Sequence, residues 1–393
     1  MRAGCLADGD EEAPIVTVES DQVHLTNPRA GGADPGPGGN GMKYAGWPHV
    51  NGDLSSVRRG AAIFLNSLEE ICGSAVQQNW ITRWTSVGDD HCVLADLNIK
   101  KGALDKASEA WLCALTAFEI ARRLADENDP QCGDVLVKIE AGIHRLRLNL
   151  EQKVERVKIA CCDQAEFPAC FLRAGDLAGS AVICITREEE TAETLLGRLL
   201  PAVVDRGISI LIVSHDDVST HLRGRADILL SCCLDYLAGR PEVDPGRIGV
   251  YGEGFSAVLA TDFAASDHRV AAAVCDGGLW NWARTVASVG WMTRAADILD
   301  ADAVLAGRSR LVRRLRCPVL VVAGGRGTVS VSEAIKLQAE CVATGKDLEL
   351  AIPHTTRTPM GEIENFVTSD DFTFGWLKSQ LASTPATSPW SAW

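Results

Sequence analysis

The sequence predicts an α/β fold, in which a mostly parallel β-sheet is covered by helices on both faces, preceded by a separate helical domain. The chain has 393 residues, 46% of them hydrophobic. Single cores stop growing at roughly 250–300 residues, so two globular parts are expected. In the first part, apolar residues recur at three- and four-residue spacing, which is typical of amphipathic helices. In the second, short β-branched runs alternate with helical patterns, and this alternation favours a parallel sheet.

The N-terminal third of the chain divides into a tail and the helical domain. Residues 1–45 are rich in Gly, Pro, Asp and Glu, and we expect a disordered acidic tail because they have too little apolar surface to offset the entropy of ordering. Residues 46–155 are expected to form the helical domain. Its clearest helical patterns are 61–72, 105–124 and 135–154.

The α/β domain is expected over residues 156–385, followed by a C-terminal tail at 386–393. A helical insertion at about 279–316 carries Trp280 and Trp282, and it is interpreted as a lid over a pocket, with ordinary helical packing as the alternative. The expected strands are 158–162, 180–186, 208–214, 247–252, 270–276, 317–324 and 348–353, with helical stretches at 190–207 and 226–240 between them.

Charge and cysteine usage exclude several classes of function. The formal net charge is −14, from 52 acidic and 38 basic residues, and it repels phosphate backbones and anionic lipids, so neither nucleic acid nor membrane is an expected partner. The 14 cysteines form no C-x-x-C pair, so no metal site is expected, and they suit a reducing cytoplasm. No apolar run reaches the roughly 18 residues that a membrane span needs. Dinucleotide and phosphate-loop motifs are missing, so no cofactor is expected.

One stretch identifies the scaffold more closely. Residues 243–260, VDPGRIGVYGEGFSAVLA, combine a strand, a sharp glycine-containing turn and a helix. This is the layout of a nucleophile elbow, in which a strained turn lifts one side chain to the top of the sheet.

With this motif, the chain resembles the α/β-hydrolase family that includes the fermentation-respiration switch protein, dihydroxypseudooxynicotine hydrolase and the fungal polyketide-shortening hydrolases. The resemblance covers about residues 47–382 and depends most on VDPGRIGVYG at 243–252, with DRGISILIVS at 205–214 and RCPVLVVAGG at 316–325 in support. It implies an α/β-hydrolase fold, hydrolysis of esters or carbon–carbon bonds by a Ser-His-Asp triad, and a homodimer or higher homo-oligomer.

The nucleophile position departs from that family. In register with the strand, the G-x-S-x-G pattern places the nucleophile at Gly254, which has no side chain to attack with. Ser256 lies two residues later, in the first turn of the following helix, where a serine caps backbone N–H groups or packs. Ser256 as the nucleophile is kept as the alternative.

The acid and base positions are altered as well. The turn expected to carry the acid reads Gly-Gly-Arg-Gly-Thr at 324–328 and has no carboxylate. Asp276, after the preceding strand, is a substitute acid or a turn residue that bonds its own backbone. His354 is the histidine available after the last strand, either as a pocket residue or as a solvated loop residue.

The loops that should form the oxyanion hole have also changed. Small residues are expected after the strand at 180–186, but Thr186 and Arg187 begin a charged stretch that continues through 188–190. The segment Ser-His-Asp-Asp at 214–217 replaces another loop of the family. Because nucleophile, acid and hole all differ, and losing a nucleophile costs about 10⁶ in rate in the serine-protease template, ordinary serine hydrolysis is not expected.

The leading hypothesis is therefore a non-hydrolytic enzyme that binds a small apolar or aromatic biosynthetic intermediate and promotes cyclisation, elimination or epimerisation. Glu253, Asp276 or His354 would transfer protons, and Glu253 is alternatively a carboxylate favoured by the adjacent helix dipole. The expected substrate-contacting residues are Thr186, Arg187, Gly254, Phe255, Trp280 and Trp282. Two alternatives stay open: a non-catalytic pseudohydrolase that only binds, and a hydrolase that uses Ser256 and His354.

Overall fold

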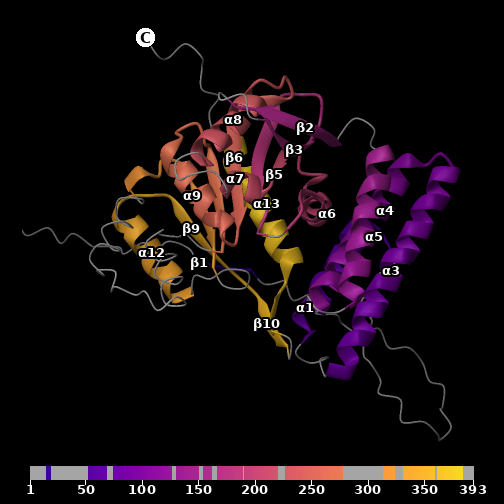
Figure 1. The fold of residues 1–393 in the computed structure, drawn as a ribbon. Coiled ribbons are helices and arrows are strands. Elements are labelled where there is room, and N and C mark those ends of the chain that lie inside the picture. The colour runs from indigo at the N-terminus through magenta and orange to yellow at the C-terminus, as the bar shows by residue number, and fades with distance from the viewer. Residues whose placement is uncertain are drawn as a thin grey trace, which may run out of the picture.

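The structure is a computed structural model that describes residues 15–18, 52–68, 74–125, 130–149, 154–161, 166–188, 190–219, 226–277, 313–323, 331–358 and 361–383. It has a bundle of long helices beside an α/β domain (Figure 1). Most of the expected lid at 279–316, with Trp280 and Trp282, lies outside the described residues. In the part of the chain that the structure describes, no helix is both long and apolar enough to span a membrane.

The N-terminal bundle confirms the expected helical region. Its helix α1 begins at Leu54, about two turns earlier than the apolar pattern suggested, because the Asp53 side chain accepts a hydrogen bond from the Ser56 backbone N–H at 2.8 Å and caps the helix. Trp111 and Phe118 are buried along the middle of the bundle. The helices of this part are α1 (Leu54–Asn66), α3 (Ser74–Lys100), α4 (Leu104–Leu124) and α5 (Pro130–Asn149).

The α/β domain is built on a nine-stranded sheet in the order β1-β9-β8-β7-β6-β4-β5-β3-β2. The run from β1 to β5 in that order is parallel, and β3 and β2 are antiparallel to their neighbours. The strands are β1 (Ile15–Val18), β2 (Val154–Ala160), β3 (Glu166–Leu172), β4 (Gly179–Ile185), β5 (Ile208–Val213), β6 (Val243–Glu253), β7 (Ala272–Asp276), β8 (Val319–Val322) and β9 (Leu348–Pro353).

Three features of the strands differ from the sequence expectations. Ile15–Val18, inside the segment expected to be a tail, form edge strand β1 on β9, because the run IVTV is β-branched and suits a sheet edge. Strand β3 was not expected, since its sequence EFPACFL includes a proline. A hairpin of β10 (Thr355–Thr358) and β11 (Gly361–Glu364) follows β9 and was not expected either.

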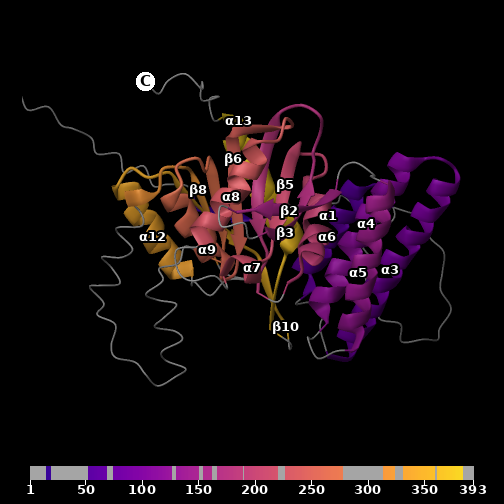
Figure 2. The same cartoon turned by 45° about the horizontal axis from the view of Figure 1, so that its top comes forward.

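Helices cover both faces of the sheet, as predicted (Figure 2). Alternate residues of β4 separate the two cores: Val182 and Cys184 belong to one, and Ala181, Ile183 and Ile185 to the other. The first core also contains side chains of the helical bundle, α6 (Ala192–Val203) and α13 (Phe366–Ser383). The second contains side chains of α7 (His215–Ser219), α8 (Ala226–Ala238), α9 (Ser256–Ser266) and α12 (Val331–Ala343).

The helical bundle docks on the sheet domain through α6, which both views place beside α4 and α5 (Figures 1 and 2). Gly197 permits this close approach, because a Cβ atom there would lie 2.9 Å from Cγ2 of Ile139 on α5. The bundle therefore stands next to the end of the sheet where β4 and β6 finish, which positions it against the candidate site.

Candidate functional site

The predicted elbow is present at the end of β6. The strand ends at Glu253, Gly254 has φ +62°, and α9 begins at Ser256. Strand and helix approach so closely that a Cβ atom on Gly252 would lie 2.2 Å from the Ser256 carbonyl oxygen. This geometry places Gly254 at the apex of the turn, where φ is positive and L side chains are strained.

Arg187 covers the apex. A Cβ atom built on Gly254 would lie 3.7 Å from Cγ and 3.8 Å from Cδ of Arg187, and 3.7 Å from a carboxylate oxygen of Glu188. From the other side, the Gly254 N–H donates to the Asp276 carbonyl at 2.7 Å. The Arg187 side chain, which follows β4, thus borders the space above the elbow.

Ser256 is fully buried and its hydroxyl has two partners. Its Oγ lies 2.6 Å from the Thr186 carbonyl oxygen and 2.7 Å from Nδ1 of His215. A carbonyl only accepts, so the hydroxyl donates to Thr186, and His215 must donate from Nδ1 to the serine oxygen. The single proton of Ser256 is therefore directed at the backbone and away from a base.

His215 was not singled out as a site residue from the sequence, although the loop at 214–217 was recognised as unusual. Its backbone N–H donates to Thr186 Oγ1 at 3.0 Å, so Thr186 and His215 tie the loops after β4 and β5 together. Burial lowers the pKa of His215 below its usual value, against the raising effects of Glu188 and Asp216. The ring is thus held uncharged in its packed setting at neutral pH.

The backbone N–H expected as an oxyanion-hole donor is bound to a carboxylate of the same loop. The Arg187 backbone N–H donates to Oε2 of Glu190 at 3.4 Å. The Glu190 side chain is only 4% exposed. A negative charge already at this donor opposes the build-up of an oxyanion there.

Glu253 lies in a buried ion-pair network and does not project as an isolated carboxylate. Arg198 of α6 hydrogen-bonds to its Oε2, and the Tyr251 hydroxyl lies 2.9 Å from the same oxygen. Arg198 also donates to Asp370 of α13 at 2.7 Å. Burial would lower the pKa of Arg198, but Asp370 and Glu253 raise it well above its usual value, so this guanidinium stays charged.

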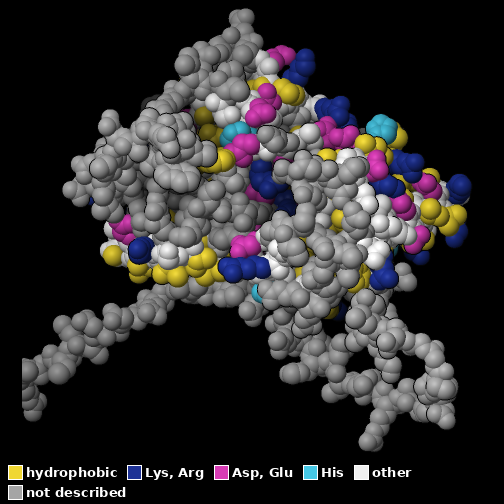
Figure 3. Space-filling view, turned by 60° about the horizontal axis from the view of Figure 1, so that its bottom comes forward, with side chains coloured by type: hydrophobic (Ala, Val, Ile, Leu, Met, Phe, Trp, Pro, Cys, Tyr) yellow, Lys and Arg dark blue, Asp and Glu magenta, His cyan; other side chains and the backbone are white. Residues whose placement is uncertain are grey.

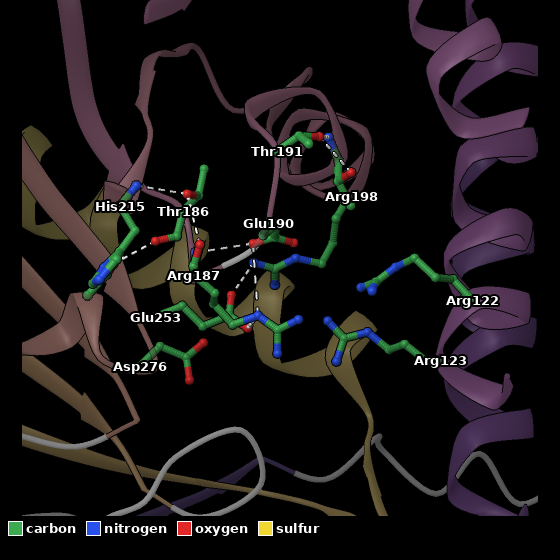
Figure 4. Close-up of polar contacts among 12 residues, drawn as sticks. Arg122, Arg123, Thr186, Arg187, Glu190, Thr191, Arg198, His215, Glu253 and Asp276 are labelled. Carbon is green, nitrogen blue, oxygen red and sulfur yellow. Dashed lines mark hydrogen bonds and ion pairs between the residues drawn. The ribbon is translucent and has the colours of Figure 1, made fainter. Parts of the chain in front are cut away.

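Two further arginines reach this network from the helical bundle. Arg122 and Arg123 of α4 extend toward Arg198 and Arg187 (Figure 4). Both bind Glu119, Arg122 with two hydrogen bonds of 2.7 Å. Burial alone would raise the pKa of Glu119, but Arg122 and Arg123 hold it well below its usual value. The surface view shows basic and acidic side chains inside a hollow of the molecule (Figure 3).

The other predicted residues lie at the same end of the sheet. Asp276 is the buried last residue of β7, and its Oδ2 lies 3.1 Å from the Tyr251 hydroxyl. His354 follows β9, and its buried Nδ1 has no hydrogen-bond partner among the described residues. Phe255 is 42% exposed beside the apex. Within the described ranges, no group of three or more His, Cys, Asp or Glu is placed to hold a metal.

Comparisons with known proteins support the fold. No family model matches the chain, and no curated protein matches it. The crystal structure of the 2,6-dihydroxy-pseudo-oxynicotine hydrolase is similar, with a TM-score of 0.54 and 15% identity, over 84% of this chain and 97% of that chain. An esterase from Pyrococcus furiosus has a TM-score of 0.44 and 15% identity, over 60% of this chain and 94% of that one. The chain has the α/β-hydrolase fold.

Proposed function

We propose that this α/β-hydrolase-fold protein works without a nucleophilic serine. In this proposal it binds a small apolar or aromatic biosynthetic intermediate at the carboxyl ends of the strands and promotes cyclisation, elimination or epimerisation. The observation that supports this proposal most strongly is that the elbow apex is Gly254 and is covered by Arg187. A site of this kind can position a substrate and move protons, but it cannot form an acyl-enzyme at the apex.

Ser256 and Glu190 support the proposal from two further directions. The Ser256 proton is bonded to the Thr186 carbonyl, so it is not directed at the neighbouring His215 ring. The Glu190 carboxylate accepts the hydrogen bond of the Arg187 backbone N–H, a donor that an oxyanion would need. Both features oppose a covalent mechanism, independently of the missing side chain at position 254.

His354 and Asp276 are the proposed proton-transfer groups. Both follow strand ends, where α/β folds bind their ligands. The buried Nδ1 of His354 is without a hydrogen-bond partner in the described part of the chain, and an uncompensated buried polar atom of this kind favours a functional role. Glu253 is proposed to hold the neighbouring charged groups in place and not to transfer protons, because Arg198 and Tyr251 already bind its carboxylate.

The experiment compares the wild-type protein with Gly254→Ser, and with Gly254→Ala as the matched control that adds the same backbone strain without a hydroxyl. Fluorophosphonate labelling, read by mass spectrometry, and hydrolysis of short and aromatic esters are measured for all three. We expect the wild type to stay at background in both assays. An adduct on Ser256, lost in Ser256→Ala, would overturn the proposal and restore a serine hydrolase that uses Ser256 and His354.

A second measurement separates catalysis from binding alone. Aryl ketones such as acetophenone are incubated with the protein in deuterated water, and incorporation at the carbon next to the carbonyl is followed by NMR. We expect protein-dependent exchange that His354→Gln reduces by about a hundredfold or more, the lower end of the range for a general base. Binding without any exchange or conversion would favour the pseudohydrolase alternative, which is supported by the burial of the Glu253 carboxylate in its ion pair with Arg198.

The assembly is proposed from the resemblance, and the compartment from the cysteine usage of the sequence. We propose a cytoplasmic homodimer or higher homo-oligomer. Sedimentation of the full chain over a range of concentrations tests the assembly, and a concentration-independent monomer would contradict it.

A further inference from the structure

We propose that the ligand bound above the elbow carries a carboxylate, and that Arg187 is the residue that binds it. This inference rests on the proposed function, since it names the class of substrate for the same site.

Arg187 lies where the reacting group of a substrate would be placed. Its Cγ and Cδ atoms lie within 3.8 Å of the position of a Cβ atom on Gly254. The side chain is 33% exposed, whereas those of Arg198 and Glu253 beneath it are 0% and 1% exposed. Arg187 is therefore the cation of this cluster that a ligand arriving at the elbow would meet.

The guanidinium of Arg187 retains its hydrogen-bonding capacity. Its Nε lies 3.5 Å from Oε1 of Glu253 and 3.9 Å from Oε2 of Glu190, both too long for good hydrogen bonds. None of the described residues accepts a hydrogen bond from its side chain, and Nε is buried without such a partner. By contrast, Arg122 makes two hydrogen bonds of 2.7 Å to Glu119. The two terminal Nη groups make no hydrogen bond to a described residue, and this planar end of the guanidinium matches a carboxylate in both shape and charge.

The surrounding charges favour a monoanion. Glu253 and Glu190 lie near the Arg187 guanidinium, and a carboxylate oxygen of Glu188 lies 3.7 Å from the Cβ position of Gly254. All three lower the pull of Arg187 on an incoming anion, and Arg198 offsets the charge of Glu253 through its own ion pair. A single negative charge can still pair with Arg187, while a doubly charged phosphate would be repelled more strongly by these glutamates.

The test uses benzoate, its neutral counterpart benzamide, and the dianion phenyl phosphate as probes, with binding to the full chain measured by calorimetry and ligand-observed NMR. We expect benzoate to bind at least about tenfold more tightly than benzamide, which is the difference that one charge-assisted hydrogen-bonded pair predicts. Phenyl phosphate should bind more weakly than benzoate. In Arg187→Met the preference for benzoate over benzamide should disappear, and Arg187→Lys should restore part of it.

Arg156→Met is the matched control, because Arg156 lies on edge strand β2, is 68% exposed and pairs with Glu193. It should leave all three affinities unchanged. Equal binding of benzoate and benzamide, a preference that survives in Arg187→Met, or no benzoate binding up to millimolar concentration would each overturn the inference. Labelling of Ser256 in the wild type would instead overturn the proposed function, so the two failures are distinguishable.

Discussion

Arg198 and Glu253 form an ion pair that is almost completely removed from solvent, with side chains 0% and 1% exposed. Arg198 comes from α6, on which the helical bundle packs, and Glu253 immediately precedes the elbow apex. Asp370 of α13 binds the same guanidinium. One arginine thus joins two helices to the turn that forms the candidate site.

Replacing Arg198 by methionine should strongly destabilise the protein. The change leaves Glu253 and Asp370 as buried charges without their shared partner, and breaking a buried pair in this way costs about 3–5 kcal/mol. Urea denaturation at pH 7 measures the loss. Arg156→Met, which removes an exposed pair, should change the free energy of unfolding by less than about 1 kcal/mol. An equal effect of the two substitutions would contradict the role given to Arg198.

His215 should make the protein less stable on mild acidification. Burial lowers its folded-state pKa below the unfolded value of 6.5, so the unfolded chain binds the proton more readily. Its contribution is fully present above pH 6.5 and is lost as pH falls from there toward the folded pKa. In His215→Gln, which retains a donor for Ser256, the decrease in melting temperature between pH 7.5 and 5.5 should be smaller. Identical pH profiles for the two proteins would contradict this assignment.

Two helical glycines should respond in opposite directions to alanine. A Cβ atom on Gly197 of α6 would lie 2.9 Å from Ile139 Cγ2, so Gly197→Ala should destabilise by about 1–3 kcal/mol, the usual range for overpacking. Gly133 of α5 has no atom within 4 Å of its Cβ position, and Gly133→Ala should stabilise by about 0.5–1 kcal/mol. Thermal unfolding of both variants provides the comparison. Stabilisation by both substitutions would show that α6 and α5 do not pack this closely.

The adjacent cysteines Cys232 and Cys233 should differ sharply in reactivity. Cys232 lines a cavity of about 720 Å³ beside β2, whereas Cys233 is buried, and burial raises the pKa of its thiol well above the usual value. Brief treatment of the native protein with iodoacetamide, followed by peptide mapping, should modify the half-buried Cys232 at least about tenfold faster than the buried Cys233, since the reagent must reach the sulfur. Denatured protein is the control, in which the two thiols should react alike.

The sequence by itself determined the fold class and the position of the elbow. Apolar periodicities distinguish helices from parallel strands, and they located the helical bundle and seven of the strands within a few residues. The run from Gly252 to Ser256 predicted the turn because its close backbone approach tolerates only glycine at some positions. For these elements, the local sequence was sufficient to predict the structure.

Only the tertiary structure decided what the site residues contact. His215 meets Ser256 across 41 residues of sequence, Arg198 meets Glu253 across 55, and Arg198 meets Asp370 across 172. Glu253 looked like a carboxylate beside a helix start, and its buried arginine comes from a helix whose sequence pattern shows only an amphipathic face. Pairings of this kind depend on which faces of distant elements pack together, and a periodic pattern in one segment contains no information about its partner.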